Sequence, residues 1–260
     1  MCGSLLVCAR QVTSRDTPNN GEQMTPTLIV TRPAPIAKAF VGQLRDRFGD
    51  QVRFITSPLL EIVPLPVADD LSEITGVIFT SAQAVDVLAL PRGLTAWCVG
   101  PRTTERAKSA GFATITGPGD AAGLAQMIMQ AAPCGRLAHI RGRHVQENVA
   151  RRLNESGIPC ADIIAYDQRP LTLTAESKNA LKGKLPVVLP LFSTRTATIL
   201  NEQGPFFAPL HVVVMSEQIK RAVGRMNAQT TGIAVQPSGR AMVDATVARL
   251  DALLKDNTEG

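Results

Sequence analysis

The sequence predicts an α/β protein made of two similar domains, each with a parallel sheet flanked by helices. Short apolar segments alternate with segments of helical periodicity along most of the chain. The joints between them are rich in Ser, Thr, Pro and Gly, and two long stretches repeat the same order of elements. Strands that alternate with helices form parallel sheets covered by helices on both faces.

The first two thirds of the chain contain seven apolar segments of strand length. They cover residues 27–31, 52–56, 76–80, 96–99, 113–116, 136–140 and 159–165. The segments between them carry apolar residues at helical spacing, as Ile36, Phe40 and Leu44 do. The helices expected here cover 34–48, 82–89, 103–110, 120–131 and 145–156.

The last third continues the alternation. Strands are expected at 187–192, 211–215 and 231–235, and helices at 194–203, 216–226 and 239–255. Residues 76–116 and 187–235 therefore share one order: strand, Ser/Thr joint, helix, strand, joint, helix, strand. A Pro/Gly turn and another helix follow each stretch. We interpret this repeat as an internal duplication that produces two domains of about five strands each.

The domain boundaries follow from the unequal number of strands. The last third has only three strands, so we assign the early strand–helix–strand unit to it. This gives a discontinuous domain, 24–56 plus 171–260, around an inserted domain, 67–160. The chain then crosses twice, at 57–66 and 161–170, through extended segments that end at proline. Because the crossings run in opposite directions, we expect them to pair as a two-stranded linker and to act as a hinge.

Composition narrows the possible partners. The chain has 27 Lys and Arg against 22 Asp and Glu, a mild excess that favours an anionic ligand. It has no basic tract that would indicate nucleic acid and no apolar run long enough to span a membrane. Five scattered cysteines in no CxxC pair indicate a reducing, cytoplasmic location. Residues 1–23 lack periodicity, and we expect them to be a disordered or untranslated tail.

Seven strand ends lead directly into helix starts, where free N–H groups and the helix dipole attract anions. Side chains at these joints are candidate carboxylate ligands. They are Arg32, Thr80, Ser81, Thr103, Thr104, Arg141, Ser193, Thr194 and Ser216. The alternative for each hydroxyl is an ordinary N-cap, and for each arginine a solvated surface position. The three histidines form no metal-binding pattern, so we expect no metal.

In order and spacing these segments resemble the uroporphyrinogen-III synthase family, over about residues 25 to 250. The matching segments are Leu28–Pro33, Phe79–Val85, Val99-Gly100 with Thr103-Thr104, Ile140–Gly142 with Leu153 and Gly157, the crossing segment around Tyr166, and Leu191–Ser193. Ser216 stands where a Gly-x-x-Thr form is frequent in the family.

The resemblance implies a cyclising lyase of tetrapyrrole biosynthesis, with its active site in the cleft between the domains. Its substrate would be hydroxymethylbilane, received from hydroxymethylbilane synthase, and its product uroporphyrinogen III with ring D inverted. It implies a monomer that needs no cofactor. Tyr166 is the single tyrosine and matches the family's active-site tyrosine in position, so we expect it to assist departure of the substrate hydroxyl. The alternative is a structural phenol at a strand end.

Two other functions fit a two-domain α/β chain. Another enzyme of this architecture, such as a nucleotide-sugar transferase, would need an acidic nucleotide-binding residue and a diphosphate loop, and the sequence shows neither. A binding protein that closes on an organic anion would use the same helix starts. Isomer-resolved product analysis separates that alternative from a synthase.

Overall fold

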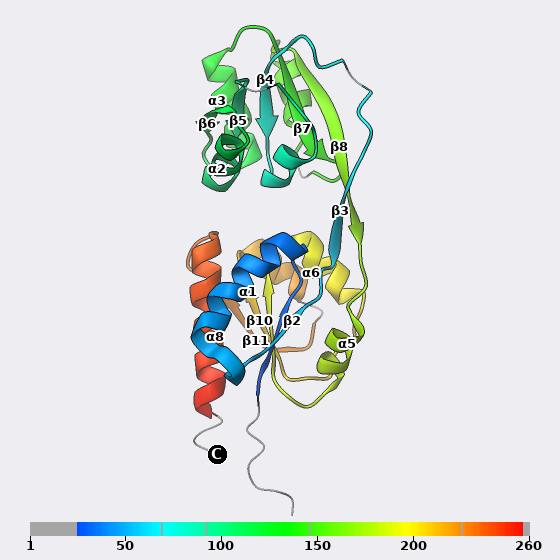
Figure 1. Ribbon diagram of the computed structural model, residues 1–260, viewed down its shortest axis with the longest axis vertical. Helices are drawn as coiled ribbons and strands as arrows, with labels where there is room; N and C mark the ends of the chain where they lie inside the picture. The colour runs from blue at the N-terminus through cyan, green and yellow to red at the C-terminus, as the bar shows by residue number, and fades with distance from the viewer. Residues whose placement is uncertain (1–24, 69, 92, 146, 225, 257–260) are drawn as a thin grey trace, which may run out of the picture.

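The computed structural model describes residues 25–68, 70–91, 93–145, 147–224 and 226–256. Two α/β units lie one above the other along the long axis of the molecule, joined by a narrow pair of strands (Figure 1). The predicted α/β fold with two parallel-strand domains is therefore confirmed. The tail expected at residues 1–23 lies outside the described residues.

The first unit contains a parallel five-stranded sheet in the order β11-β10-β9-β1-β2. Its strands are β1 (Thr27–Val30), β2 (Arg53–Thr56), β9 (Val187–Leu191), β10 (Leu210–Val214) and β11 (Ala228–Ile233). Its helices are α1 (Ala34–Phe48), η1 (Gly49–Gln51), α5 (Ala175–Lys182), α6 (Thr194–Asn201), α7 (Glu217–Val223) and α8 (Gly239–Asp256). Alternate residues of β1 point to opposite faces. Leu28 packs with α1 and α8, and Ile29 packs with α5, α6 and α7.

The second unit contains a six-stranded sheet in the order β3-β8-β7-β4-β5-β6. Its strands are β3 (Leu60–Pro64), β4 (Ile74–Phe79), β5 (Thr95–Cys98), β6 (Ala113–Thr116), β7 (Arg136–Gly142) and β8 (Cys160–Pro170). Its helices are η2 (Ala82–Asp86), α2 (Pro101–Ser109), α3 (Ala121–Ala131) and α4 (Val149–Glu155). One core joins the sheet to η2 and α2, and the other joins it to α3 and α4. Each unit thus buries its own apolar residues.

The two units are circular permutations of one topology. Strands β4, β5 and β6 occupy the positions of β9, β10 and β11, and the pair β7–β8 occupies that of β1–β2. The pair comes first along the chain in one unit and last in the other. This arrangement explains why the internal repeat is visible between 76–116 and 187–235, while the early unit 27–56 stands apart from it.

The linker is the antiparallel pair of β3 and β8. Its register runs from Leu60 opposite Pro170 to Pro64 opposite Tyr166. The expected pairing of the two crossings is confirmed. The first half of β8, from Cys160, also pairs with β7. This strand is therefore part of the second sheet in its first half and part of the linker in its second half. The domain bounds drawn at 67–160 and 161–170 stay a prediction.

Several elements differ from their expected form. The segment expected as a helix at 82–89 is the short 3-10 helix η2, and the helix expected from 145 begins only at Val149. Helix α5 was not expected, because its apolar residues, Ala175, Ala180 and Leu181, are too few for a helical pattern. Asn148 caps α4 by accepting from Arg151 N, which sets the later start of that helix.

Candidate active site

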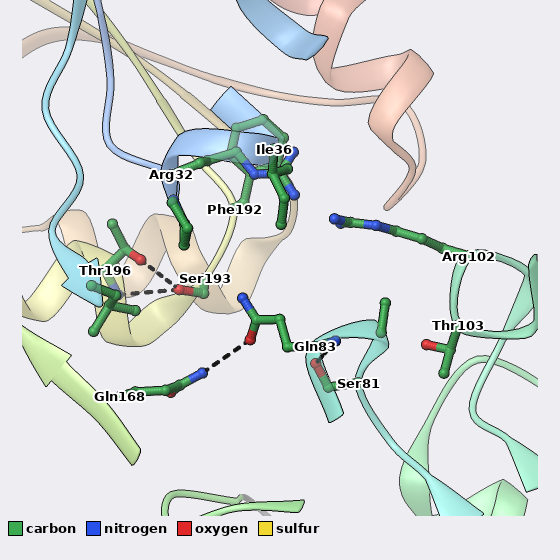
Figure 2. A pocket seen from close by; sticks show the side chains of 13 residues that line it. Arg32, Ile36, Ser81, Gln83, Arg102, Thr103, Gln168, Phe192, Ser193 and Thr196 are labelled. Carbon is green, nitrogen blue, oxygen red and sulfur yellow. Dashed lines mark hydrogen bonds between the residues drawn. The ribbon is translucent and has the colours of Figure 1, made fainter. Parts of the chain in front are cut away.

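A pocket of about 300 Å³ lies between the two units, with walls from both (Figure 2). The first unit contributes Arg32, Pro33, Ile36, Phe192, Ser193 and Thr196, the second Ser81, Ala82, Gln83, Arg102 and Thr103, and the linker Leu60 and Gln168. The lining holds two arginines and several hydroxyl and amide groups but no Asp or Glu. It therefore favours an anionic ligand.

Two further hollows extend this pocket. One, of about 660 Å³, shares Ile36, Gln83 and Arg102 with it. The other, of about 530 Å³, is mostly apolar and shares Ile36, Leu60 and Gln83. The ligand space is thus an elongated cleft with one mostly apolar side. Its outer parts also contain Glu61, Asp86 and Glu105, so only the central pocket is free of carboxylates.

Arg32 is held against the first unit. It follows β1, and its guanidinium carbon lies 4.0 Å from the centroid of the Phe192 ring. Burial, and then the charge of Arg102, lower the pKa of Arg32 to about 10, so the side chain stays cationic at neutral pH. Within the described residues neither arginine has a carboxylate partner. Both charges remain available to a ligand.

The helix starts beside these arginines are open. Helix α1 begins after Pro33 and helix α2 after Gly100, and neither has a side-chain cap. Each helix has proline in its first turn, where the missing N–H of proline removes no hydrogen bond within the helix. The remaining free N–H groups of the first turn sit at the positive end of each helix dipole. An anion in the cleft can satisfy them.

The predicted serines cap their own helices. Ser81 accepts a hydrogen bond from Gln83 N at 3.3 Å, Ser193 from Thr196 N at 3.2 Å, and Ser216 from Ile219 N at 3.4 Å. Ser81 and Ser193 still line the pocket, whereas Ser216 does not. The N-cap alternative therefore describes what these hydroxyls do in the unliganded cleft.

The predicted threonines fall into three settings. Thr103 is 5% exposed, lines the pocket, and its hydroxyl has no hydrogen-bond partner among the described residues. Thr80 and Thr104 bond inside the second unit, to His139 at 3.1 Å and to the Gly100 carbonyl at 3.1 Å. Thr194 does not line this pocket but a neighbouring hollow of about 560 Å³, which shares Gln168 and Ser193 with it. Thr103 is thus the hydroxyl most free to meet a ligand.

Arg141 is turned into the second unit. It is 7% exposed and makes a bidentate ion pair with Asp162, at 2.5 and 2.7 Å. Asn148 donates a further hydrogen bond to the same carboxylate at 2.8 Å. Burial acts to raise the pKa of Asp162, but the hydrogen bonds from Arg141 and Asn148 prevail and hold it below its usual value. The Arg141 charge is therefore compensated internally.

Tyr166 lies just behind the pocket wall. Its side chain is 3% exposed and packs in the core of the second unit. Burial raises the pKa of the phenol, and hydrogen bonds with the Ser81 side chain and the Gly142 backbone act in the opposite direction. A Cβ at Gly142 would lie 2.6 Å from Cε2 of the ring. The absence of a side chain at 142 therefore makes room for the phenol, and Ser81 links it to the pocket.

Several pocket residues were not predicted as ligands, among them Gln83, Arg102, Gln168 and Phe192. Gln168 donates from Nε2 to Oε1 of Gln83 at 3.4 Å, so a linker side chain touches the second unit at the pocket (Figure 2). Arg102 stands within the joint Val99–Thr103, so its position at a helix start was a usable signal. Phe192 carried no such signal, because an aromatic residue at a strand end is ordinarily core.

The fold and this cleft define a class of protein: a two-domain α/β chain with a pocket between its domains that two arginines line. A family model described as Uroporphyrinogen-III synthase HemD matches residues 39–244. The chain therefore belongs to the uroporphyrinogen-III synthase family, whose members are cyclising lyases. No curated protein matches the chain in sequence. Across the described residues, no helix is long and apolar enough to cross a membrane.

Comparison with solved structures supports the same fold through one similarity. The uroporphyrinogen-III synthetase of Helicobacter pylori superposes with a TM-score of 0.63 at 16% identity, over 86% of this chain and 99% of that one. A mutant uroporphyrinogen III synthase of Thermus thermophilus covers 88% of this chain and 99% of its own, at 13% identity and a TM-score of 0.48. The first of these similarities establishes the shared fold.

Proposed function

We propose that this chain converts linear hydroxymethylbilane into uroporphyrinogen III, closing the macrocycle with inversion of ring D and release of water. The family match supports the reaction. The single structural observation that supports the ligand is the inter-unit pocket, which presents Arg32 and Arg102 and no carboxylate. The substrate carries eight carboxylates, so a central pocket with two arginines and no carboxylate in its lining complements it.

The chemistry needs positioning more than a strong acid and base. The electron-rich pyrrole expels the hydroxyl as water once a proton reaches it, leaving an azafulvene cation. The substituted α-carbon of ring D attacks this cation and gives a spiro intermediate. The bond from that carbon to the methylene of the neighbouring ring then breaks, which leaves a second azafulvene cation. The other α-carbon of ring D bonds to that methylene, so ring D is inverted, and loss of a proton restores the pyrrole. Holding the chain in this geometry is the enzyme's main task, because simple closure competes.

Tyr166 is the proposed proton donor to the leaving hydroxyl. Its raised pKa keeps the phenol protonated at neutral pH, as a general acid requires. The hydrogen bond with Ser81 aligns it toward the pocket, and the displaced proton returns to it when the pyrrole is restored. Gly142 has no side chain and so leaves the ring its space.

The predicted ligands divide by position. Arg32, Ser81, Thr103 and Ser193 are proposed to meet substrate carboxylates directly, since all four line the pocket. Thr80, Thr104 and Arg141 are proposed to hold the second unit's part of the site through their internal bonds. Thr194 and Ser216 are proposed as outer contacts for the longer end of the substrate, through the helix starts that they occupy.

The setting of the reaction is also part of the proposal. The unstable substrate would come directly from hydroxymethylbilane synthase, and the chain would act as a cytoplasmic monomer. The two units already supply both walls of the pocket, so a second copy is not required to complete it. Light scattering of the purified chain gives the mass that tests the monomer.

The test is an isomer-resolved assay. Hydroxymethylbilane is generated in place by hydroxymethylbilane synthase, and the products are oxidised to uroporphyrins and separated by chromatography. We expect the type III isomer to predominate with the chain present, and type I in a blank without it. Circular dichroism checks that the chain is folded. If a folded chain gives the same product mixture as the blank, synthase activity is ruled out and an anion-binding protein remains.

A further inference from the structure

Arg32 and Arg102 come from different units and face the same pocket. Figure 2 shows the Arg102 side chain reaching from the second unit toward the side where Arg32 and Ile36 lie. The charge of Arg102 contributes to the lowered pKa of Arg32, so the two guanidinium groups interact across the gap. Two like charges therefore oppose each other over the space that closure of the units would shorten.

Neither arginine has a carboxylate partner among the described residues. Arg102 lies in the first turn of α2, at the positive end of the helix dipole, where an acidic residue would be stabilising. Arg32 is partly buried against Phe192, which itself packs edge-on against Phe40 at 5.3 Å. By contrast, Arg47, Arg53 and Arg106 each pair with a carboxylate. The two cleft arginines are placed for a charge that the ligand must bring.

A second feature of α2 also indicates an anion. Thr103 is only 5% exposed, and it lines the pocket. Its hydroxyl nevertheless has no hydrogen-bond partner among the described residues. The uncapped first turn of α2 adds free N–H groups at the same point. A carboxylate there would receive hydrogen bonds from Thr103 and the backbone and an ion pair from Arg102.

We propose that Arg32 and Arg102 form a charge-gated clamp: without an anion they repel and hold the cleft open, and a ligand carboxylate between them draws the two units together. Arg102 is thereby a further substrate-positioning residue. The identity of the anion as a substrate carboxylate rests on the proposed function, but the repulsion in the unliganded chain does not. The narrow β3–β8 linker provides the place where the units bend.

The sharpest test uses no ligand. In Arg102→Glu the repelling pair becomes an attracting one, so solution scattering should give a smaller radius of gyration and maximum dimension than wild type. Arg102→Gln should fall between them. Lys108→Glu changes the charge equally on the same helix but outside the pocket lining, and should match wild type. At about 1 M salt, where charges are screened beyond roughly 3 Å, the differences should vanish.

The second arm adds a polyanion that is not turned over. Benzenehexacarboxylate and uroporphyrin III should each compact the wild-type chain. They should bind Arg102→Gln roughly tenfold or more weakly, because a charge-assisted hydrogen bond is lost. In the bilane assay the same variant should raise KM by a similar factor with a smaller effect on kcat, whereas Lys108→Glu should leave both unchanged.

The outcomes separate the clamp from the function. If Arg102→Glu is more compact than wild type and Lys108→Glu is not, the clamp is supported. This holds even if the wild-type chain makes only the type I product and the proposed function fails. A folded Arg102→Glu with wild-type dimensions overturns the clamp, even if the type III product forms. Equal compaction of Lys108→Glu also overturns it, because the effect would then follow net charge and not the facing pair.

Discussion

At Tyr166, burial and hydrogen bonding determine which proton chemistry the phenol can perform. The ring is 3% exposed in an apolar core, and the hydroxyl meets Ser81 at the back of the pocket wall. A phenol in this setting stays protonated at neutral pH and is oriented by its hydrogen bonds with Ser81 and the Gly142 backbone. The rest of the pocket contacts its ligand through arginines, hydroxyls and backbone N–H groups.

Replacing Tyr166 with Phe should slow type III formation by about 10²-fold, because the donor to the leaving hydroxyl is lost. Substrate affinity should stay near wild type, since the arginines and helix starts remain. Single alanine changes at Ser81, Thr103 or Ser193 should cost less, because backbone donors survive them. Steady-state kinetics with the spontaneous type I background subtracted make the comparison. Wild-type turnover in the Phe variant would remove Tyr166 from the mechanism.

Changing Gly142 to Ala should impair the site by displacing the Tyr166 ring, which lies behind the pocket wall. The added Cβ would meet the Tyr166 ring at 2.6 Å, so the ring must move or the strand must bend, at a cost of about 1–3 kcal/mol in unfolding free energy. Turnover should fall with it. Gly42→Ala is the matched control: it lies in α1 with no atom near its Cβ and should stabilise by up to about 1 kcal/mol. Urea unfolding and the isomer assay measure both variants.

Among the elements, β7 carries the most unusual polar packing. His139 is fully buried in this strand, its Nε2 bonds to Thr80 at 3.1 Å, and its Nδ1 has no partner among the described residues. Burial, modified by the charges of Asp162 and Arg141, lowers its pKa to about 4. The strand therefore holds a neutral imidazole beneath the joint that presents Thr80 to the cleft.

This strand should make the fold sensitive to mild acid. The unfolded histidine takes up a proton near pH 6.5 and the folded one only near pH 4, so stability is complete above about 6.5 and falls as the pH drops toward 4. The loss at pH 5 should be about 2 kcal/mol. Urea unfolding of wild type and His139→Gln at several pH values tests this. The variant should show a shallower pH slope than wild type between pH 6.5 and 4.

For the molecule as a whole, the controlling feature is that each unit has its own cores and only two strands connect them. The first unit packs Leu44 of α1 at 0% exposure, and the second packs Leu124 of α3 at 0%. No apolar core cluster contains described residues of both sheets apart from the linker strands. Independent cores joined by a thin linker favour independent unfolding and rigid-body motion.

Calorimetry should therefore resolve two unfolding transitions in the unliganded chain. Leu44→Ala should lower one of them and Leu124→Ala the other, each by about 2–5 kcal/mol of unfolding free energy for its own unit. Uroporphyrin III, which would bind both units, should raise both transitions and bring them together. A single transition lowered equally by the two variants would show that the units fold as one.

Local patterns determined most of the fold. The periodicity of 34–48 and the apolar segments beside it predicted α1 and its neighbouring strands, because helical and strand spacing are properties of a few adjacent residues. The repeat between 76–116 and 187–235 predicted two like units, and the proline-terminated crossings predicted their linker. Helix α5 was missed because too few apolar residues mark its buried face.

The candidate site was only partly accessible to the same reasoning. The sequence placed Ser81, Thr103 and Arg32 at strand ends, and from its resemblance it placed Tyr166 in the crossing. Tertiary structure alone decided that Arg141 turns inward to Asp162, that the Tyr166 phenol lies behind Ser81, and that Arg102 faces Arg32. The physical reason is the distance along the chain over which each feature is determined. A strand end is set by its neighbours in the chain, whereas the partner of a charge or hydroxyl depends on which distant surface the completed fold brings opposite it.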